Sequence, residues 1–187
     1  MPYVEGESLR ERLDRQQLLP IDEAIRHARA IGSALDYAHR QGIIHRDIKP
    51  ENVMLYEGEA MVMDFGIAKA VSAAGSQTLT QTGMMVGTPA YVSPEQAAGE
   101  ELDARSDQYS LACVLYELLA GEKPFAGATE TIAYKICHES ARPPSALSRL
   151  NLSPTIDAVL AVALEKSPDA RFQNARAFSR GLREARN

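Results

Sequence analysis

Residues 106–120 are apolar around nearly the whole circumference of a helix, and this stretch constrains the fold more than any other part of the sequence. In a helix, Tyr109 and Tyr116 lie on one face, and Leu111 and Leu118 lie on the opposite one. The glycine that follows is a typical helix end. A helix that is apolar on all sides must be covered by other elements, so we expect it at the centre of the domain.

Amphipathic patterns predict further helices around this central one. Apolar residues recur at three- and four-residue steps over 21–38, and Gly42 ends that helix. Ser93 and Pro94 are a capping residue and a first-turn proline, which mark another helix start. Three more helices with capping residues are expected over 129–138, 153–166 and 174–185.

Two short β runs, 52–56 and 60–63, are joined through a Glu-Gly turn and predict a hairpin. From 66 to 87 the chain is rich in Ser, Thr, Gly and Gln without a clear period, which predicts a long loop. The length of 187 residues suggests a single domain. The expected fold class is therefore mainly α, a helical bundle with one small β-hairpin.

Composition argues against several classes of protein. A net charge of −5 argues against nucleic acid or an anionic membrane surface as the main partner. No apolar run approaches the ~18 residues of a membrane span, and the first residues do not resemble a secretion signal. Cys113 and Cys137 lack metal-ligand or CxxC spacing, which favours reduced thiols. We therefore expect a cytoplasmic location.

The chemistry of the chain is concentrated between the first long helix and the hairpin. Asp47 offers a carboxylate, Lys49 an amine and Asn52 an amide, and Asp64 follows as a second carboxylate. Phosphoryl transfer needs a carboxylate that receives a hydroxyl proton, hard oxygen ligands for Mg²⁺, and a cation for the phosphate charge. All of these groups occur here, on one loop supported by the expected hairpin.

The motifs HRDIKPEN at 45–52 and DFG at 64–66 resemble those of eukaryotic-type (Hanks-type) Ser/Thr protein kinases. The resemblance implies that Asp47 is the catalytic base and that Lys49 neutralises the γ-phosphate. It implies Asn52 and Asp64 as ligands of Mg²⁺ (or Mn²⁺), ATP as the cofactor, and a packing role for His45.

Downstream residues extend the resemblance. The run GTPAYVSPE at 87–95 is similar to the peptide-positioning loop of the family, where Thr88 would contact the catalytic base. Asp107 resembles the buried helix residue that accepts hydrogen bonds from the catalytic-loop backbone. Glu95 and Arg171 resemble the internal ion pair of the family. These correspondences imply a kinase-like C-terminal lobe.

Residues 64–95 would then be the activation segment. Arg46, beside the catalytic Asp, is typical of kinases whose loop is ordered by phosphorylation. The run from 79 to 96 is most similar to bacterial receptor-type Ser/Thr kinases, in which Thr80 and Thr82 hold the autophosphorylated positions. The alternative is a polar loop whose hydroxyls are simply solvated.

The resemblance begins at the hinge between the two lobes, residues 1–6. There Pro2 and Val4 would face adenine, and Met54 would lie beneath it. No Gly-rich loop and no strand lysine precede the hinge, so we expect the N-terminal β lobe to be missing. The expected domain is partial, 1–187, with the catalytic loop and strand at 42–55 and a helical subdomain at 96–187.

Two functions of different classes remain open. The first is a Ser/Thr kinase that acts on Ser and Thr hydroxyls of protein substrates and is weakly active or inactive as an isolated chain. The second is an inert kinase-like scaffold or binding module from a truncated gene. The presence of Asp47, Lys49, Asn52 and Asp64 favours the first. The family also allows a kinase–kinase dimer; neither nucleic acid nor a membrane segment is expected.

Overall fold

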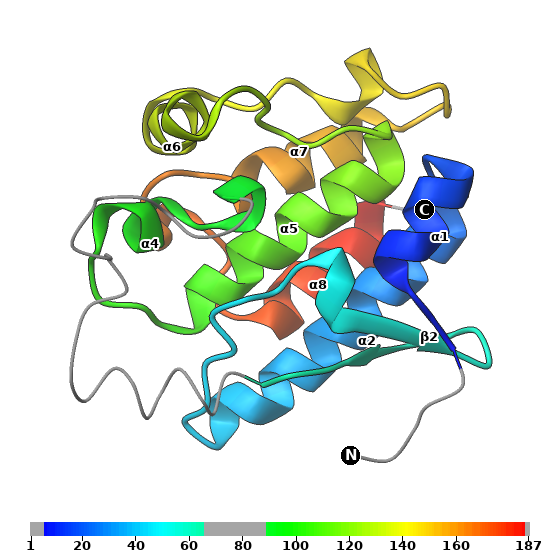
Figure 1. Cartoon of the computed structure of the whole chain (residues 1–187), viewed down its shortest axis with the longest axis horizontal. Coiled ribbons are helices and arrows are strands. Elements are labelled where there is room, and N and C mark those ends of the chain that lie inside the picture. Colours follow the sequence, from blue (N-terminus) through cyan, green and yellow to red (C-terminus); the bar gives the residue numbers. More distant parts are fainter. Residues whose placement is uncertain (1–5, 66–88, 186–187) are drawn as a thin grey trace.

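The chain folds around one helix. The computed structural model describes residues 6–65 and 89–185, and in it α5 (Ala104–Ala120) runs through the middle of the molecule, as Figure 1 shows. Every residue from 106 to 120 is buried. The helix begins two residues earlier than predicted, because the Asp103 side chain accepts a 2.7 Å hydrogen bond from the Arg105 N–H. It ends at Gly121, whose φ of 78° is the left-handed conformation favoured by glycine.

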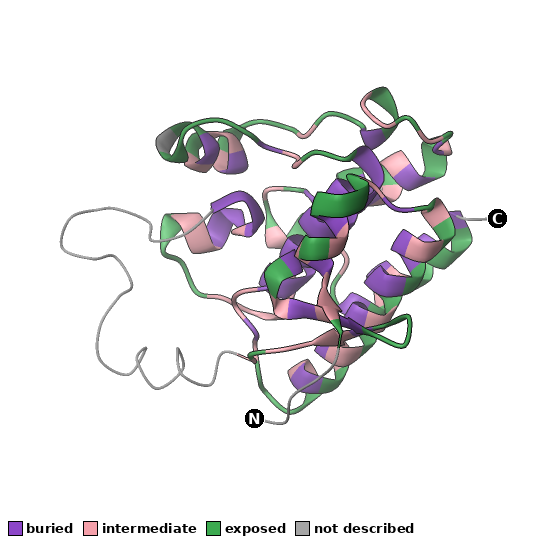
Figure 2. Cartoon of the chain, turned by 45° about the vertical axis from the view of Figure 1, so that its right-hand side comes forward, coloured by how far each residue is buried: buried purple, intermediate pink, exposed green. Residues whose placement is uncertain are grey.

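Three amphipathic helices cover α5. These are α2 (Ile21–Arg40), α7 (Pro154–Ala163) and α8 (Ala175–Ala185). Figure 2 shows such helices with buried and exposed positions on opposite faces. The helix expected over 153–166 stops at Ala163, and the carbonyls of Glu165 and Lys166 instead accept hydrogen bonds from the Arg171 side chain.

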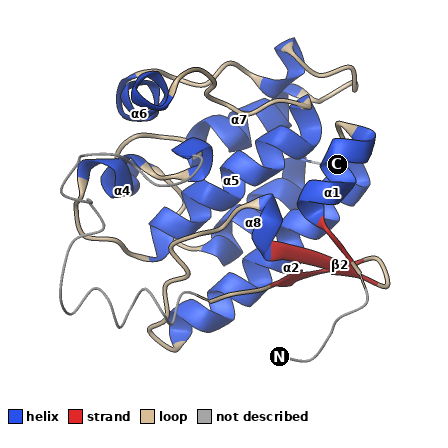
Figure 3. Cartoon of the chain, viewed as in Figure 1, coloured by secondary structure: helices blue, strands red, loops and turns tan. Residues whose placement is uncertain are grey.

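A small antiparallel sheet lies beside the helices (Figure 3). Strands β2 (Val53–Tyr56) and β3 (Glu59–Val62) form the predicted hairpin, with Val53 opposite Val62. The short strand β1 (Glu7–Ser8) adds to the other edge of β2, a pairing that the sequence did not indicate. The mainly helical class with a minor sheet is confirmed.

One helix was missed by the sequence analysis. Helix α1 (Leu9–Gln16) begins with a capping box, in which the Ser8 hydroxyl accepts from the Glu11 N–H and the Glu11 carboxylate accepts from the Ser8 N–H. The remaining elements are α4 (Pro94–Ala98), α6 (Thr129–His138) and the 3₁₀ turns η1 (Pro50–Asn52), η2 (Pro89–Tyr91), η3 (Pro144–Ala146) and η4 (Pro168–Ala170). In the described part of the chain, no helix is both long and apolar enough to cross a membrane.

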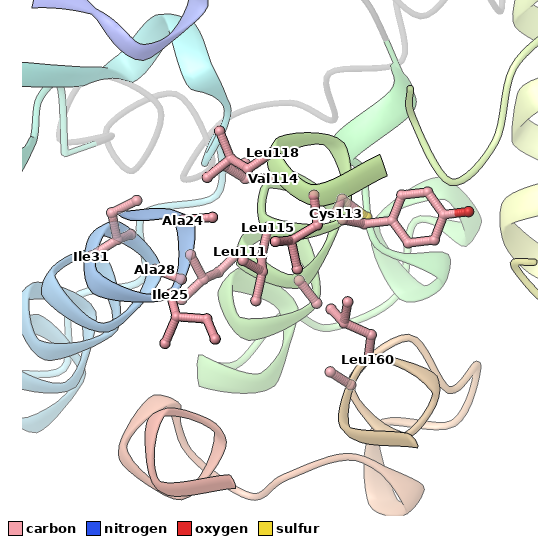
Figure 4. Close-up of a cluster of buried hydrophobic side chains, with 14 of the residues drawn as sticks. Ala24, Ile25, Ala28, Ile31, Leu111, Cys113, Val114, Leu115, Leu118 and Leu160 are labelled. Atoms are coloured by element: carbon pink, nitrogen blue, oxygen red, sulfur yellow. The ribbon is translucent and has the colours of Figure 1, made fainter. Parts of the chain in front are cut away.

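The core is continuous between α2, α5 and α7. Figure 4 shows Ile25 and Ala28 of α2 on one side of α5 and Leu160 of α7 on another, with Leu111 and Leu115 between them. All five side chains are at most 1% exposed. Because the apolar surface of α5 is covered on several sides, this helix sets the position of everything attached to it.

Leu111→Ala tests the central role of α5. Leu111 is fully buried, so we expect a loss of about 2–5 kcal/mol in the free energy of unfolding, from lost burial and the remaining cavity. Urea unfolding measures it. Val162→Ala on α7, where the side chain is exposed, is the control and should change stability by no more than ~0.5 kcal/mol. Equal losses in the two variants would contradict the assignment of the core.

Candidate active site

The loop between α2 and the hairpin is held by a carboxylate of the central helix. Asp107 of α5 accepts hydrogen bonds from the backbone N–H groups of His45, at 2.7 Å, and Arg46, at 2.8 Å. Its Oδ2 also lies 2.8 Å from Nε2 of His39, near the end of α2. Asp107 is 1% exposed. The site loop is therefore fixed to the most buried element of the fold.

Arg46 adopts a backbone conformation that side chains rarely take. Its φ is 68°, in the left-handed region, and its N–H points at Asp107 while its carbonyl accepts a 3.0 Å hydrogen bond from the Gln96 side chain on α4. Two partners on different helices thus hold a strained turn directly before Asp47. Such strain is characteristic of functional loops, where surrounding structure must maintain it.

His45 joins the loop to the segment after β3. Its Nδ1 accepts a hydrogen bond from the Asp47 N–H at 3.3 Å, so Nε2 carries the hydrogen that is donated to the Met63 carbonyl at 2.9 Å. The ring also meets Phe65 edge to face, with 4.9 Å between centroids. His45 is fully buried, and its contacts are packing and positioning contacts.

Three polar side chains converge at the end of this loop. The Lys49 Nζ lies 3.0 Å from Asp47 Oδ2. Asn52 donates from Nδ2 to the Asp47 carbonyl at 2.8 Å and to Asp47 Oδ2 at 3.2 Å. The side chains of Lys49 and Asp47 are 33% and 35% exposed, so the group is open to a ligand from solvent. A carboxylate, a cation and an amide therefore meet at one accessible point.

The structure also brings Asp64 to this region. The Met63 N–H donates to the Asn52 carbonyl at 2.8 Å, which places the residue before Asp64 next to the loop. Asp64 itself is exposed and has a φ of 53°. Because Nδ2 of Asn52 is used by Asp47, its Oδ1 is the atom that could bind a cation. Amide and carboxylate oxygens are suitable ligands for Mg²⁺.

The described residues do not form a complete metal site by themselves. Within residues 6–65 and 89–185, no group of three His, Cys, Asp or Glu side chains is arranged to hold a metal ion. Mg²⁺ commonly uses one or two protein ligands together with substrate phosphates and water. The pair Asn52 and Asp64 fits that mode of binding, in which the metal arrives with a nucleotide.

Glu95 and Arg171 form a buried ion pair. Arg171 donates to both oxygens of Glu95, at 2.9 and 2.8 Å, and the Ser106 hydroxyl donates to Glu95 at 2.7 Å. Burial raises the pKa of Glu95, but the hydrogen bonds from Arg171 and Ser106 outweigh it, and the net pKa is lowered from 4.5. The guanidinium also lies 4.8 Å from the Tyr109 ring centroid. The pair fixes α4 to the segment before α8.

Of the remaining predicted residues, one is described by the structure and five are not. Met54 lies on β2, paired with Ser8 of β1. Five others fall outside the described residues: Pro2, Val4, Thr80, Thr82 and Thr88.

A second polar cluster was missed by the sequence analysis. Arg10 of α1 donates to Glu117 of α5 at 3.0 Å, to Glu51 of η1 at 3.3 Å and to the Tyr91 hydroxyl at 2.5 Å. Tyr91 in turn donates to Glu117. Burial and the neighbouring Glu117 raise the pKa of Tyr91. The sequence did give one indication of this cluster. Glu117 lies within the apolar stretch 106–120, and a buried glutamate requires a hydrogen-bonding or charged partner.

The helical fold and the site loop define a class of protein, and comparisons identify it. A family model described as protein kinase domain matches residues 1–180, so the chain belongs to the protein kinase family. Its fold is that of the kinase C-terminal lobe. The chain is 47% identical over 177 residues to the probable serine/threonine-protein kinase SCO3848 of Streptomyces coelicolor, and 46% identical to PknB of Mycobacterium tuberculosis.

Coverage differs between the chain and its relatives. The matches include 94% of this chain but 26% and 28% of those two proteins, so the chain spans about a quarter of their length. Among solved structures, the PknI kinase domain of Mycobacterium tuberculosis matches with a TM-score of 0.74 at 31% identity. That match covers 99% of this chain and 64% of the other.

Glu95→Gln should change how the free energy of unfolding depends on pH. The folded-state pKa of Glu95 is lowered, so its ionised form stabilises the fold above the unfolded value of about 4.5, and this contribution is lost as pH falls through the folded pKa. At pH 7 we expect the variant to lose about 3–5 kcal/mol, because Arg171 keeps its charge without an ionised partner. Below pH 4.5 the gap between the two proteins should narrow.

Urea unfolding between about pH 3 and 7 measures this gap. Glu101→Gln, at an exposed position, is the matched control and should follow the wild type throughout. A gap between wild type and Glu95→Gln that stayed constant over the whole range would show that ionisation of Glu95 does not support the fold.

Proposed function

We propose that this chain is the catalytic-loop part of a Ser/Thr protein kinase that transfers the γ-phosphoryl group of ATP to Ser or Thr hydroxyls of proteins. The observation that carries the proposal is the convergence of Asp47, Lys49 and Asn52 within hydrogen-bond distance on a loop that Asp107 holds. Membership of the kinase family and relatives named as serine/threonine-protein kinases support it.

The roles follow from the chemistry of each group. Asp47 accepts the proton of the substrate hydroxyl as it attacks the γ-phosphorus, because its carboxylate is accessible and is oriented by the Asn52 amide. Lys49, 3.0 Å from that carboxylate, places a positive charge where the transferred phosphoryl group would be. Asn52 and Asp64 would hold Mg²⁺, which would neutralise phosphate charge when bound with ATP.

Other parts of the nucleotide site are further proposals. Met54 would lie under the adenine, with Pro2 and Val4 at its edge. The solved kinase domain that the chain matches is longer than the chain, and Asp47 and Lys49 are a third exposed here. Water in an open site weakens each electrostatic contact, so we expect low activity from the isolated 187 residues.

We further propose that phosphorylation of Thr80 or Thr82 regulates the site. Arg46 supports this, because its Nε is buried and lacks a hydrogen-bond partner within the described ranges. A phosphate would supply charge-assisted hydrogen bonds to that guanidinium, directly beside Asp47. The proposal of a Ser/Thr protein kinase also includes protein substrates, a cytoplasmic location and a kinase–kinase dimer.

Asp47→Asn tests the assignment of the base. Loss of a positioned base should lower turnover by about 10²–10⁴-fold, since the amide cannot accept the hydroxyl proton. The assay follows labelled phosphate from Mg-ATP, first with the 187-residue chain and then with the chain extended upstream by a kinase N-terminal lobe. Glu57→Gln, exposed in the hairpin turn, is the control and should retain activity.

Asp64→Ala runs beside these variants to show that any label depends on the metal ligand. Full turnover by Asp47→Asn would overturn the assignment. A completed protein that folds yet transfers no label would favour the inert scaffold.

Mass spectrometry of the active, completed protein tests the regulatory proposal. We expect phosphate on Thr80 or Thr82, and Thr80→Ala/Thr82→Ala should lower activity, because Arg46 would lose its counter-charge. The control is Ser145→Ala in η3, which is exposed and remote in sequence from the loop. An unmodified loop in fully active enzyme would contradict the proposal.

A further inference from the structure

Five exposed arginines lie along the seam between α2 and α8, here called the arginine seam. Arg26 and Arg29 are one turn apart on α2, and Arg176, Arg180 and Arg183 recur at helical spacing on one face of α8. The two helices pack against each other, side by side in Figure 1. The chain carries a net charge of −5, so this concentration of positive charge is local.

Contacts at two points establish how the helices are aligned. Gly32 of α2 is so close to α8 that an added Cβ would lie 2.6 Å from the Ser179 hydroxyl. Ile21, at the start of α2, lines the same hollow as Ala185, at the end of α8. The helices are therefore antiparallel. Arg29 lies one turn before Gly32, and Arg180 directly follows Ser179, so both belong to the parts of α2 and α8 that are in contact.

The arginines of the seam differ in their ion pairing from most other arginines of the described residues. Within residues 6–65 and 89–185, none of its five arginines takes part in an ion pair. Six other arginines each pair with a carboxylate: Arg10, Arg12, Arg15, Arg40, Arg105 and Arg171. The seam thus collects like charges that form no ion pair with a carboxylate in the described part of the chain.

Arg176 adds a second unfavourable feature. It lies in the first turn of α8, where the partial positive charge of the helix N-terminus disfavours a cation. Glu184 is the single acidic residue of that helix and lies at its opposite end. Both features would be relieved by an anion bound along the seam. Local rules of charge placement are commonly broken at functional sites.

The shape of the surface at one end of the arginine seam suits a bound peptide better than a membrane. Where α2 begins and α8 ends lies an open hollow of about 430 Å³, lined mainly by apolar surface that includes Ile21, Leu150 and Ile156. Asp22 also lines this hollow, so the surface at this end of the seam carries charges of both signs. A concave apolar surface beside positive charge suits a peptide side chain next to an anionic group, whereas a bilayer presents a broad plane.

We propose that the arginine seam binds a phosphorylated Ser/Thr segment of a protein, with an apolar side chain of the same segment in the hollow. All five basic groups of the seam are arginine, and the planar guanidinium binds phosphate through two parallel hydrogen bonds that a lysine cannot form. The binding does not require that the chain be catalytically active. The proposed kinase function and this surface can therefore succeed or fail separately.

Fluorescence anisotropy with the full 187-residue chain tests the proposal. The probe is a labelled peptide with two phosphothreonines four residues apart and one leucine, together with its unphosphorylated form. At about 0.15 M salt, where screening removes long-range attraction, we expect the phosphorylated peptide to bind at least ~10-fold more tightly. Arg180→Glu should weaken that binding by ~10-fold or more, and Arg180→Lys by less, since charge remains without the planar fork.

The matched control is Arg142→Glu, an exposed arginine outside the seam that changes the net charge equally. It should alter binding by less than ~2-fold, and thermal melting should show all variants folded. Equal affinity for the two peptides, equal losses in Arg180→Glu and Arg142→Glu, or binding only to phosphatidylserine vesicles would each overturn the proposal. The last result would identify a membrane surface instead.

Discussion

The carboxylate of Asp107 is the contact on which the geometry of the site depends. A buried charge is costly unless hydrogen bonds satisfy it, and here two backbone N–H groups and a histidine do so. The two backbone donors belong to the loop that carries Asp47. The same interaction therefore satisfies the charge and imposes the left-handed turn at Arg46. One set of hydrogen bonds therefore both satisfies a buried carboxylate and sets the geometry of the loop.

The pair Glu95 and Arg171 works differently, although it is also buried. It joins segments far apart in the sequence, α4 and the turn before α8, and its hydrogen bonds extend to Ser106 and to backbone carbonyls. Buried pairs add little net stability compared with apolar residues, but they permit few alternative arrangements. This pair specifies how the last helices meet α5, while apolar burial supplies most of the driving force.

Much of this architecture could be predicted from the sequence, because its strongest patterns are local. The all-round apolar stretch indicated the central helix, and the Glu-Gly turn indicated the hairpin. Helix α1 was missed because it is short and mainly polar, although its Ser8–Glu11 capping box is a recognisable pattern. The cluster of Arg10, Glu51, Tyr91 and Glu117 joins four distant segments, and single-sequence reasoning gives no long-range pairing of this kind. The arginine seam is likewise visible only once α2 and α8 are side by side.

Asp107 and Glu117 lie on the same straight helix, ten residues apart. At 1.5 Å of rise per residue, α5 separates their Cα atoms by roughly 15 Å along its axis. One end of α5 holds the backbone of the loop before Asp47, and the other holds Tyr91 and Arg10. The buried helix thus fixes the distance between Asp107 and Glu117. Surface loops around the site could change in length or sequence during evolution while the distance between these two anchor points stayed constant.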